Sequence, residues 1–168
     1  MKESISRKSK KIKVGWFTFT CCEGCAIIFI ELLNDKFKEW SEKIEFRHFK
    51  ILKSKNNLDE LDLAIVEGAV STKDEVNLLK EIRDKSKFVM AVGSCALTGM
   101  PAGLRNNFDN EKKKEIEKIL KKFDYLESVE PVSKFIRVDF RVPGCPMDGD
   151  QFVKEFSSFI EQHSYDFK

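Results

Sequence analysis

The sequence predicts one α/β domain built on a mostly parallel sheet with helices on both faces. Segments with a strand pattern alternate with segments of helical periodicity along the chain, which is the order found in parallel α/β proteins. Two of the strand segments, Leu61–Val66 and Phe88–Val92, are short and almost wholly apolar, as expected of strands buried on both faces. With 168 residues, 42% of them apolar, the chain is long enough for a single core.

The first part of the chain is expected to form a strand, a turn, a helix and a second strand. Lys11–Phe19 is rich in β-branched and aromatic residues and predicts the first strand. A turn containing cysteines and a glycine follows at Cys21–Cys25. Apolar residues at helical spacing then predict a helix over Ala26–Trp40, and Ile44–Leu52 predicts the second strand.

A second helix is expected between the two apolar strands. Ser71 or Thr72 is suited to cap it, because Glu75 stands three residues after Thr72 in the pattern of a capping box. The helix is expected to run to about Lys85, shortly before the strand Phe88–Val92.

The last part of the chain begins with an expected loop from Pro101 to Asn110. A heavily charged helix with one apolar face is predicted over Glu111–Phe123. Phe135–Val142 alternates in part and predicts a final strand, and Gln151–Ile160 predicts a closing amphipathic helix. We find no internal repeat and no linker between domains.

The composition excludes several classes of protein. Thirty Lys and Arg residues against 28 Asp and Glu leave a formal charge of +2, which gives no case for a nucleic-acid binder. No stretch approaches the roughly 18 consecutive apolar residues of a membrane span. The basic start of the chain is not followed by the apolar stretch and cleavage site of a secretory signal. We therefore expect a flexible basic tail over residues 1–12, one domain over residues 13–168 and a cytoplasmic location.

The cysteines are the strongest functional signal. The chain has five: Cys21, Cys22, Cys25, Cys95 and Cys145. Each stands just after a predicted strand, and the loops that follow parallel strands meet at one edge of a sheet. Each of the three segments also has a glycine beside its cysteine, which lets the backbone approach a bulky group closely. Four thiolates around an iron–sulfur core need such an approach, so the pattern favours a 4Fe–4S cluster.

Other roles for the thiols compete with the cluster. Buried cysteines often act as small apolar residues, but here all five stand in predicted loops near glycine. Disulfides are not expected in a cytoplasmic chain of this size. A thioredoxin-like pair would leave two of the three cysteine loops unexplained. Structural zinc is the better competitor, because Cys22-x-x-Cys25 fits a zinc knuckle, although Cys95 and Cys145 form no second knuckle.

Four motifs resemble those of a known family. They are Thr20-Cys21-Cys22-Glu23-Gly24-Cys25, Val66-Glu67-Gly68-Ala69-Val70, Gly93-Ser94-Cys95-Ala96 with the following Gly99-Met100-Pro101-Ala102, and Pro143-Gly144-Cys145-Pro146. In order and spacing they resemble the small subunit of nickel–iron hydrogenases, in the superfamily shared with the 20-kDa cluster subunit of respiratory complex I. The resemblance extends from about Lys13 to Phe159, and it implies a flavodoxin-like domain whose cluster faces a partner large subunit.

The resemblance implies that Cys22, Cys25, Cys95 and Cys145 bind one proximal 4Fe–4S cluster. Cys22 and Cys25 are preferred as the first pair because Cys-x-Gly-Cys is the hydrogenase form. Complex I subunits use two adjacent cysteines, however, and Cys21-Cys22 also offers that pattern. If Cys22 and Cys25 are the ligand pair, Cys21 is a neighbour of the ligands or an inert thiol.

Glu67 stands in the second motif and has two candidate roles. It would be a carboxylate close to the cluster and the partner, in proton transfer or in hydrogen bonding to a ligand loop. Alternatively, it satisfies backbone N–H groups at the start of a helix.

The function implied is electron transfer. The chain would relay single electrons between the nickel–iron site of a large subunit and a further iron–sulfur or flavin redox subunit or carrier. It has one C-x-x-C pair, whereas a nickel-binding subunit needs two, so no nickel site is expected in this chain. No cysteine follows Cys145, so the resemblance is to the short, one-cluster type of small subunit.

Two alternatives stay open. The same cluster would also serve a complex I-like assembly that reduces a quinone or carrier without hydrogen chemistry. From a different class, the chain would be a zinc-stabilised interaction module without a redox role.

A cluster bound at one edge of a small domain is poorly shielded from oxidation and loss unless a partner subunit covers it. We therefore expect the loops Thr20–Cys25, Glu67–Thr72, Ser94–Arg105 and Gly144–Asp148 to form one face. Val70, Leu97, Met100, Leu104 and Met147 are expected at or near that contact.

Overall fold

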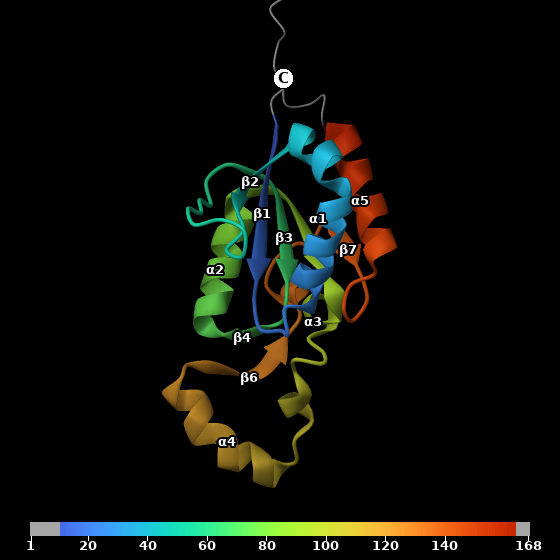
Figure 1. The fold of residues 1–168 in the computed structure, drawn as a ribbon. Coiled ribbons are helices and arrows are strands. Elements are labelled where there is room, and N and C mark those ends of the chain that lie inside the picture. Colours follow the sequence, from blue (N-terminus) through green and yellow to red (C-terminus); the bar gives the residue numbers. More distant parts are fainter. Residues whose placement is uncertain (1–10, 164–168) are drawn as a thin grey trace, which may run out of the picture.

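The computed structural model describes residues 11–163 and has the expected α/β architecture (Figure 1). Its main sheet has five parallel strands in the order β2-β1-β3-β5-β7. Their bounds are Ile12–Thr18 for β1, Ile44–His48 for β2, Leu61–Glu67 for β3, Ser86–Val92 for β5 and Phe140–Val142 for β7. This is the strand order of flavodoxin-like sheets, so the predicted fold class is confirmed. The tail expected over residues 1–12 lies, except for its last two residues, outside the described part of the chain.

Helices cover both faces of the sheet, as predicted. α1 (Gly24–Lys43) and α5 (Gly149–His163) lie on one face, and α2 (Lys73–Asp84) lies on the other (Figure 1). The short α3 (Gly93–Thr98), which the sequence did not predict, follows β5 directly. Within residues 11–163 no helix has the length and apolar character needed to cross a bilayer.

Each face of the sheet has its own apolar core, because successive strand side chains point to opposite faces. In β3, Leu63 and Ile65 belong to the cluster shared with α1 and α5. Their neighbours Ala64 and Val66 belong to the cluster shared with α2. All four side chains are fully buried, which explains why this strand is almost wholly apolar in sequence.

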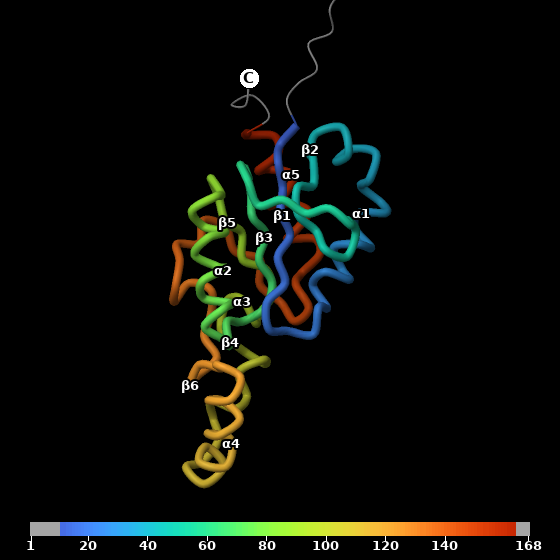
Figure 2. The backbone as a smooth tube through the Cα atoms, turned by 90° about the vertical axis from the view of Figure 1, so that its left-hand side faces the viewer, coloured from blue at the N-terminus to red at the C-terminus, as the bar shows by residue number. Residues whose placement is uncertain are grey.

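A projection extends beyond the edge at which β1 and β3 end (Figures 1 and 2). Its base is a two-stranded antiparallel ribbon of β4 (Val70–Thr72) and β6 (Tyr125–Glu130). A 3-10 turn over Leu104–Asn107 and the helix α4 (Asn110–Lys122) lie between the ribbon strands in sequence, and a second 3-10 turn over Val132–Lys134 leads back to the sheet. The ribbon was not predicted, whereas the charged helix was.

Two strands are several residues shorter in the structure than their predicted bounds. The strand expected over Ile44–Leu52 ends at His48, because Leu52 and Lys53 donate their N–H groups to the carbonyl of Phe49 and form a turn. The strand expected over Phe135–Val142 contains only Phe140–Val142.

The start of that last segment folds back on the preceding turn. The N–H groups of Phe135 and Ile136 both donate to the carbonyl of Val132, which makes a helical turn instead of an extended strand. The strand β7 forms only after Asp139, whose N–H bonds the carbonyl of Val89.

Candidate metal centre

All five cysteines lie at the carboxyl edge of the sheet, as the topology predicts. Cys21 and Cys22 follow β1, and Cys25 is in the first turn of α1. Cys95 is in α3, directly after β5, and Cys145 lies between β7 and α5. Since β1, β5 and β7 are parallel, their ends lie on one side of the molecule. All five thiols are free.

The first cysteine loop is fixed to the end of β3. Thr20 and Ala69 exchange both backbone hydrogen bonds, at 3.0 and 2.9 Å, so the chain leaving β1 is tied to the chain leaving β3. Glu23 then takes a left-handed conformation with φ of 62° and turns the chain into α1. Its N–H donates to Cys21 Sγ at 3.3 Å. Cys21 thus faces the turn that precedes the helix.

The thiol of Cys25 touches both of the other cysteine segments. A Cβ atom added to Gly93 would lie 2.4 Å from Cys25 Sγ, so only glycine admits the sulfur there. Gly93 also has φ of 80°, a conformation that residues with side chains rarely adopt. From the other side, the N–H of Met147 donates to Cys25 Sγ at 3.4 Å. The start of α3 and the loop after β7 therefore meet at this sulfur.

Further hydrogen bonds join the second and third cysteine segments. The N–H and the hydroxyl of Ser94 both donate to the carbonyl of Gly144, at 2.7 and 3.0 Å. The residues next to Cys95 and Cys145 are therefore held together by hydrogen bonds within the chain.

Burial favours the neutral form of three thiols, those of Cys21, Cys25 and Cys95. Burial raises the pKa of Cys21 to about 12 and that of Cys25 to about 11, and their N–H donors only partly oppose this effect. Burial also raises the pKa of Cys95, with smaller contributions from the nearby Cys145 and Cys22 thiols. Because a metal binds thiolates, a bound metal would supply the positive charge that releases these protons.

Glu67 is fully buried at the end of β3, between β1 and β5. Its Oε1 accepts from Trp16 Nε1 at 3.1 Å and from the Thr18 hydroxyl at 2.8 Å. Its Oε2 accepts from the N–H of Ala26 at 3.1 Å, in the first turn of α1. Glu67 therefore links the end of β1 to the helix that contains Cys25. Trp16 and Thr18 were not predicted as its partners, although strand alternation places them on one face.

The donor set suits an iron–sulfur core. Among residues 11–163, no group of three or more His, Cys, Asp or Glu side chains is placed to hold a metal ion, so the fit rests on the kind and number of the donors. The thiols are spread over three loops, and a 4Fe–4S core binds each of its thiolates at a different iron atom. Two N–H groups already point at sulfur atoms, that of Glu23 at Cys21 and that of Met147 at Cys25. Their direction depends on loop conformation, so sequence reasoning missed both.

The surface around the thiols differs in part from the expected one. Cys22 and Cys145 are exposed, and Leu104 is 61% exposed, so this edge is open in the isolated chain. Val70 and Met147, expected at or near a partner contact, are buried within the chain itself and offer a partner no surface of their own. Both fill the domain's own core beneath the loops.

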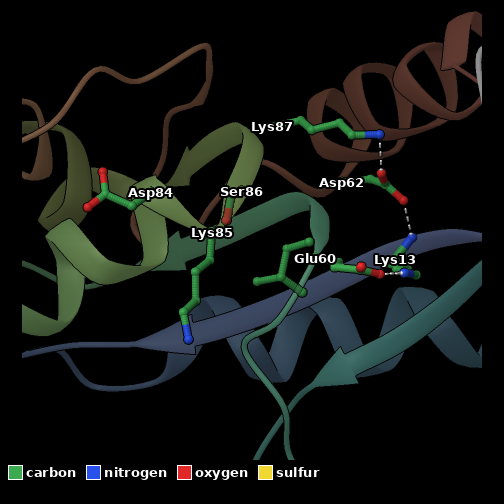
Figure 3. Close-up of a pocket in the computed structure, with 8 residues that line it drawn as sticks. Lys13, Glu60, Asp62, Asp84, Lys85, Ser86 and Lys87 are labelled. Carbon is green, nitrogen blue, oxygen red and sulfur yellow. Dashed lines mark hydrogen bonds and ion pairs between the residues drawn. The ribbon is translucent and has the colours of Figure 1, made fainter.

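A cavity of about 410 Å³ lies at the opposite, amino edge of the sheet, far from the cysteines in the topology. Figure 3 shows several of its charged residues paired with one another. Lys87 contacts Asp62 at 2.9 Å, and Asp62 also accepts the N–H of Lys13 at 2.8 Å. Lys13 in turn pairs with Glu60. These ion pairs stabilise the strand ends, and the cysteine edge is the better candidate site.

The sequence and the fold both match known proteins. The family model for the NADH ubiquinone oxidoreductase 20 Kd subunit matches residues 22–159. The chain is 33% identical over 140 residues to sulfhydrogenase 2 subunit delta of Pyrococcus furiosus, covering 83% of this chain and 58% of that protein. It is 30% identical over 141 residues to the coenzyme F420 hydrogenase gamma chain of Methanosarcina barkeri, covering 82% and 50%. The chain thus spans about half the length of these curated relatives.

Among solved structures, a chain of an NAD⁺-reducing [NiFe]-hydrogenase in the H₂-reduced state has a similar fold. The TM-score is 0.79 at 22% identity, and the match covers 91% of this chain and 93% of that one. A chain of the [NiFeSe]-hydrogenase of Dm. baculatum matches with a TM-score of 0.66 at 18% identity, covering 92% and 63%. Both structures share the fold described above, and the resemblance drawn from the four motifs is confirmed.

Proposed function

The chain belongs to the family of the NADH ubiquinone oxidoreductase 20 kDa subunit, and on that basis we propose that it is the electron-transfer small subunit of a nickel–iron hydrogenase. One observation supports the proposal above all. Cys22, Cys25, Cys95 and Cys145, from three distant segments, lie together at the carboxyl edge of one parallel sheet. The named relatives, which are hydrogenase subunits, support the choice of reaction.

In this proposal those four cysteines hold one 4Fe–4S cluster. When bound, such a cluster supplies reversible transfer of single electrons. The protein's part is to place the sulfur atoms and to set their surroundings. The N–H group of Met147 donates to the sulfur of Cys25, and hydrogen bonds to the sulfurs help to set the potential of such a group.

The remaining residues of the site position the ligands. Gly93 leaves the space that the Cys25 sulfur occupies. Glu67 holds the first turn of α1 through the N–H of Ala26, directly after Cys25. We assign Glu67 a positioning role, since both of its oxygens accept hydrogen bonds from within the domain. Cys21 is assigned as a neighbour of the ligands, bonded to the turn at Glu23.

The partner in this proposal is the nickel-binding large subunit. Cys22 and Cys145 are exposed in the isolated chain, and an exposed cluster is open to oxidation and loss. A large subunit covering this edge would shield it and bring the nickel–iron site within reach. A further iron–sulfur or flavin redox subunit would exchange the electrons, and the complex is proposed to be cytoplasmic.

A complex I-like role without hydrogen chemistry is the second candidate. The description of the matching family model favours it, and so does the adjacent pair Cys21-Cys22. A zinc-stabilised module without redox chemistry is the third, since Cys22-x-x-Cys25 fits a zinc knuckle.

The test is anaerobic purification of the tagged chain from its native host, followed by metal analysis of the complex. We expect that a nickel-containing subunit co-purifies with the chain and that the complex reduces a dye in the presence of hydrogen. The complex should also absorb visible light at about 400 nm, and dithionite should bleach this absorption. A coloured complex without nickel would replace the proposal with the complex I-like candidate. A colourless complex containing zinc would leave only the zinc-stabilised module.

A further inference from the structure

The projection at the carboxyl edge forms a distinct arm, which we define as residues 101–131. Figures 1 and 2 show that α4 and β6 extend away from the main sheet on the side where β1 and β3 end. The family model spans residues 22–159, so the arm lies within the matched region.

The arm is held in one position by side-chain hydrogen bonds at its base. Arg105 Nη1 donates to the carbonyls of Leu126 and Glu127, both at 2.9 Å. The Asn106 amide pairs with the backbone of Val129 in both directions, each bond at 2.8 Å. The ribbon of β4 and β6 adds a third attachment. A projection fixed in this way presents its surface at a defined place.

The helix of the arm has an apolar stripe that the chain covers only in part. Ile116, Ile119, Leu120 and Phe123 follow helical spacing, so they share one face. Ile116 and Leu120 are half-buried, but Ile119 is 54% exposed and Phe123 is 58% exposed. No residue of α4 is buried. Helices gain most of their stability from packing of an apolar face. More than half of the surface of Ile119 and of Phe123 is left uncovered by the described chain.

Other exposed apolar side chains gather on the same arm. Leu104 is 61% exposed, Tyr125 40% and Phe108 36%. Together with Ile119 and Phe123 they make up five of the ten large apolar residues that are exposed in the described structure. This concentration in one projection is typical of a protein–protein contact.

We infer that the arm is a docking element for the same large subunit that covers the cysteine edge, an inference that rests on the proposed function. The cysteine edge and the arm form one continuous structure, because the N–H of Gly99 donates to the carbonyl of Cys95 at 2.9 Å and the N–H of Gly103, in the arm, donates to the carbonyl of Gly99 at 2.7 Å. Leu104 follows directly and is exposed. A subunit that shields the exposed Cys22 and Cys145 therefore meets the base of the arm.

The surface area that such a contact needs also supports the large subunit as the partner of the arm. Obligate interfaces commonly bury about 2,000 Å² or more and resemble a divided core. The thiol loops occupy one edge of a small domain, and Val70 and Met147 of that edge are already used inside the chain. The exposed apolar side chains of the arm, among them Leu104, Ile119 and Phe123, supply additional surface.

The test uses the tagged chain, purified anaerobically from its host with its partners. The double variant Ile119→Ser with Phe123→Ser removes the uncovered half of the stripe. Both side chains are exposed, so the fold of the chain is expected to remain. A matched control, Lys114→Ser with Lys118→Ser, changes two exposed residues on the opposite side of the same helix.

We expect about tenfold weaker retention of the nickel-containing subunit by the apolar variant, and unchanged retention by the control. Hydrogen exchange at the amides of α4 should slow when the wild-type complex forms, and this protection should be lost in the apolar variant. If the wild type retains a nickel subunit and the apolar variant retains it equally well, the docking inference is wrong while the proposed function stands.

Two other results would also overturn the inference. If the apolar variant dissociates a dimer of this chain but leaves the nickel subunit bound, the arm binds a second copy. If it releases only a third, non-nickel subunit, the arm binds that subunit. If the wild type retains no nickel subunit, the proposed function itself has failed.

Discussion

The backbone N–H of Met147 donates to the sulfur of Cys25 at 3.4 Å, although 122 positions separate the two residues in the chain. On its other side, the same sulfur lies 2.4 Å from the point where a Cβ of Gly93 would be. One thiol thus contacts the segments that contain Cys95 and Cys145. Contacts within the chain therefore bring these three segments together at one sulfur atom.

The first prediction concerns the choice between adjacent and spaced ligands. Replacing Cys25 by Ser should deplete the cluster severely, whereas replacing Cys21 by Ser should leave most of it. Cys25 meets both other cysteine segments, while the hydrogen bond to the Cys21 sulfur comes from the neighbouring turn at Glu23. Iron and sulfide content of the anaerobic complex is the measurement. The reverse order of loss would establish Cys21-Cys22 as the ligand pair.

The second prediction concerns Gly93. In Gly93→Ala the new Cβ would collide with Cys25 Sγ, and the backbone would keep an unfavourable positive φ. We expect a loss of about 1–3 kcal/mol in stability and incomplete cluster loading. Gly149→Ala is the matched control, since its Cβ would make ordinary contacts at 3.6 Å or more. Thermal unfolding and iron content together distinguish the two variants. Full loading and wild-type stability in Gly93→Ala would contradict the described geometry.

The third prediction concerns Glu67. In Glu67→Gln an NH₂ group replaces one acceptor oxygen and then faces an N–H that can only donate, that of Trp16 at Oε1 or that of Ala26 at Oε2. The Thr18 hydroxyl can turn to accept, but it cannot satisfy that second donor. A buried donor left without an acceptor costs about 1–3 kcal/mol, so the variant should unfold at a lower temperature. Thr18→Val removes a single donor and should cost less. A larger loss in Thr18→Val than in Glu67→Gln would show that the carboxylate does not organise this region.

The fourth prediction is a pH dependence of stability. Burial lowers the pKa of His48 below 6.5, and the nearby Lys50 contributes in the same direction, although the bond to the Trp16 carbonyl opposes them. The unfolded chain therefore binds the proton more readily than the folded one. Stability should be fully present above about pH 6.5 and should fall as the pH drops from there towards the folded pKa. Unfolding midpoints at about pH 7.5 and about pH 5.5 check this, and His48→Gln should reduce the difference between them. An equal difference in both proteins would exclude His48 as its source.

Local sequence signals predicted much of the fold. The capping box at Thr72 is present, since the Thr72 hydroxyl accepts from the N–H of Glu75 and the Glu75 carboxylate accepts from the N–H of Thr72, both at 3.1 Å. The apolar strands β3 and β5 form as expected, because burial on both faces demands an apolar run. The ribbon of β4 and β6 was missed because it pairs short segments far apart in the chain, which no local pattern reveals.

The candidate site was predictable in position but not in detail. Parallel topology alone places the loops of Cys22, Cys95 and Cys145 at one edge. The direction of individual backbone N–H groups was not predictable, because it depends on the conformation of the loop and not on the type of residue. The bond from Met147 to Cys25 exists only because the third cysteine loop folds back against α1.

The central claim is that Cys22, Cys25, Cys95 and Cys145 together hold one 4Fe–4S cluster, and the Cys145→Ser variant tests it most directly. Cys145 is the only thiol of its loop, so no neighbour can replace it. Iron and acid-labile sulfide are to be measured in wild type and variant complexes purified anaerobically side by side, with electron paramagnetic resonance after dithionite reduction. We predict about four iron and four sulfide per wild-type chain, with a reduced-cluster signal, and severe depletion of all three in the variant. A Cys145→Ser complex with the full wild-type iron, sulfide and signal would contradict the assignment.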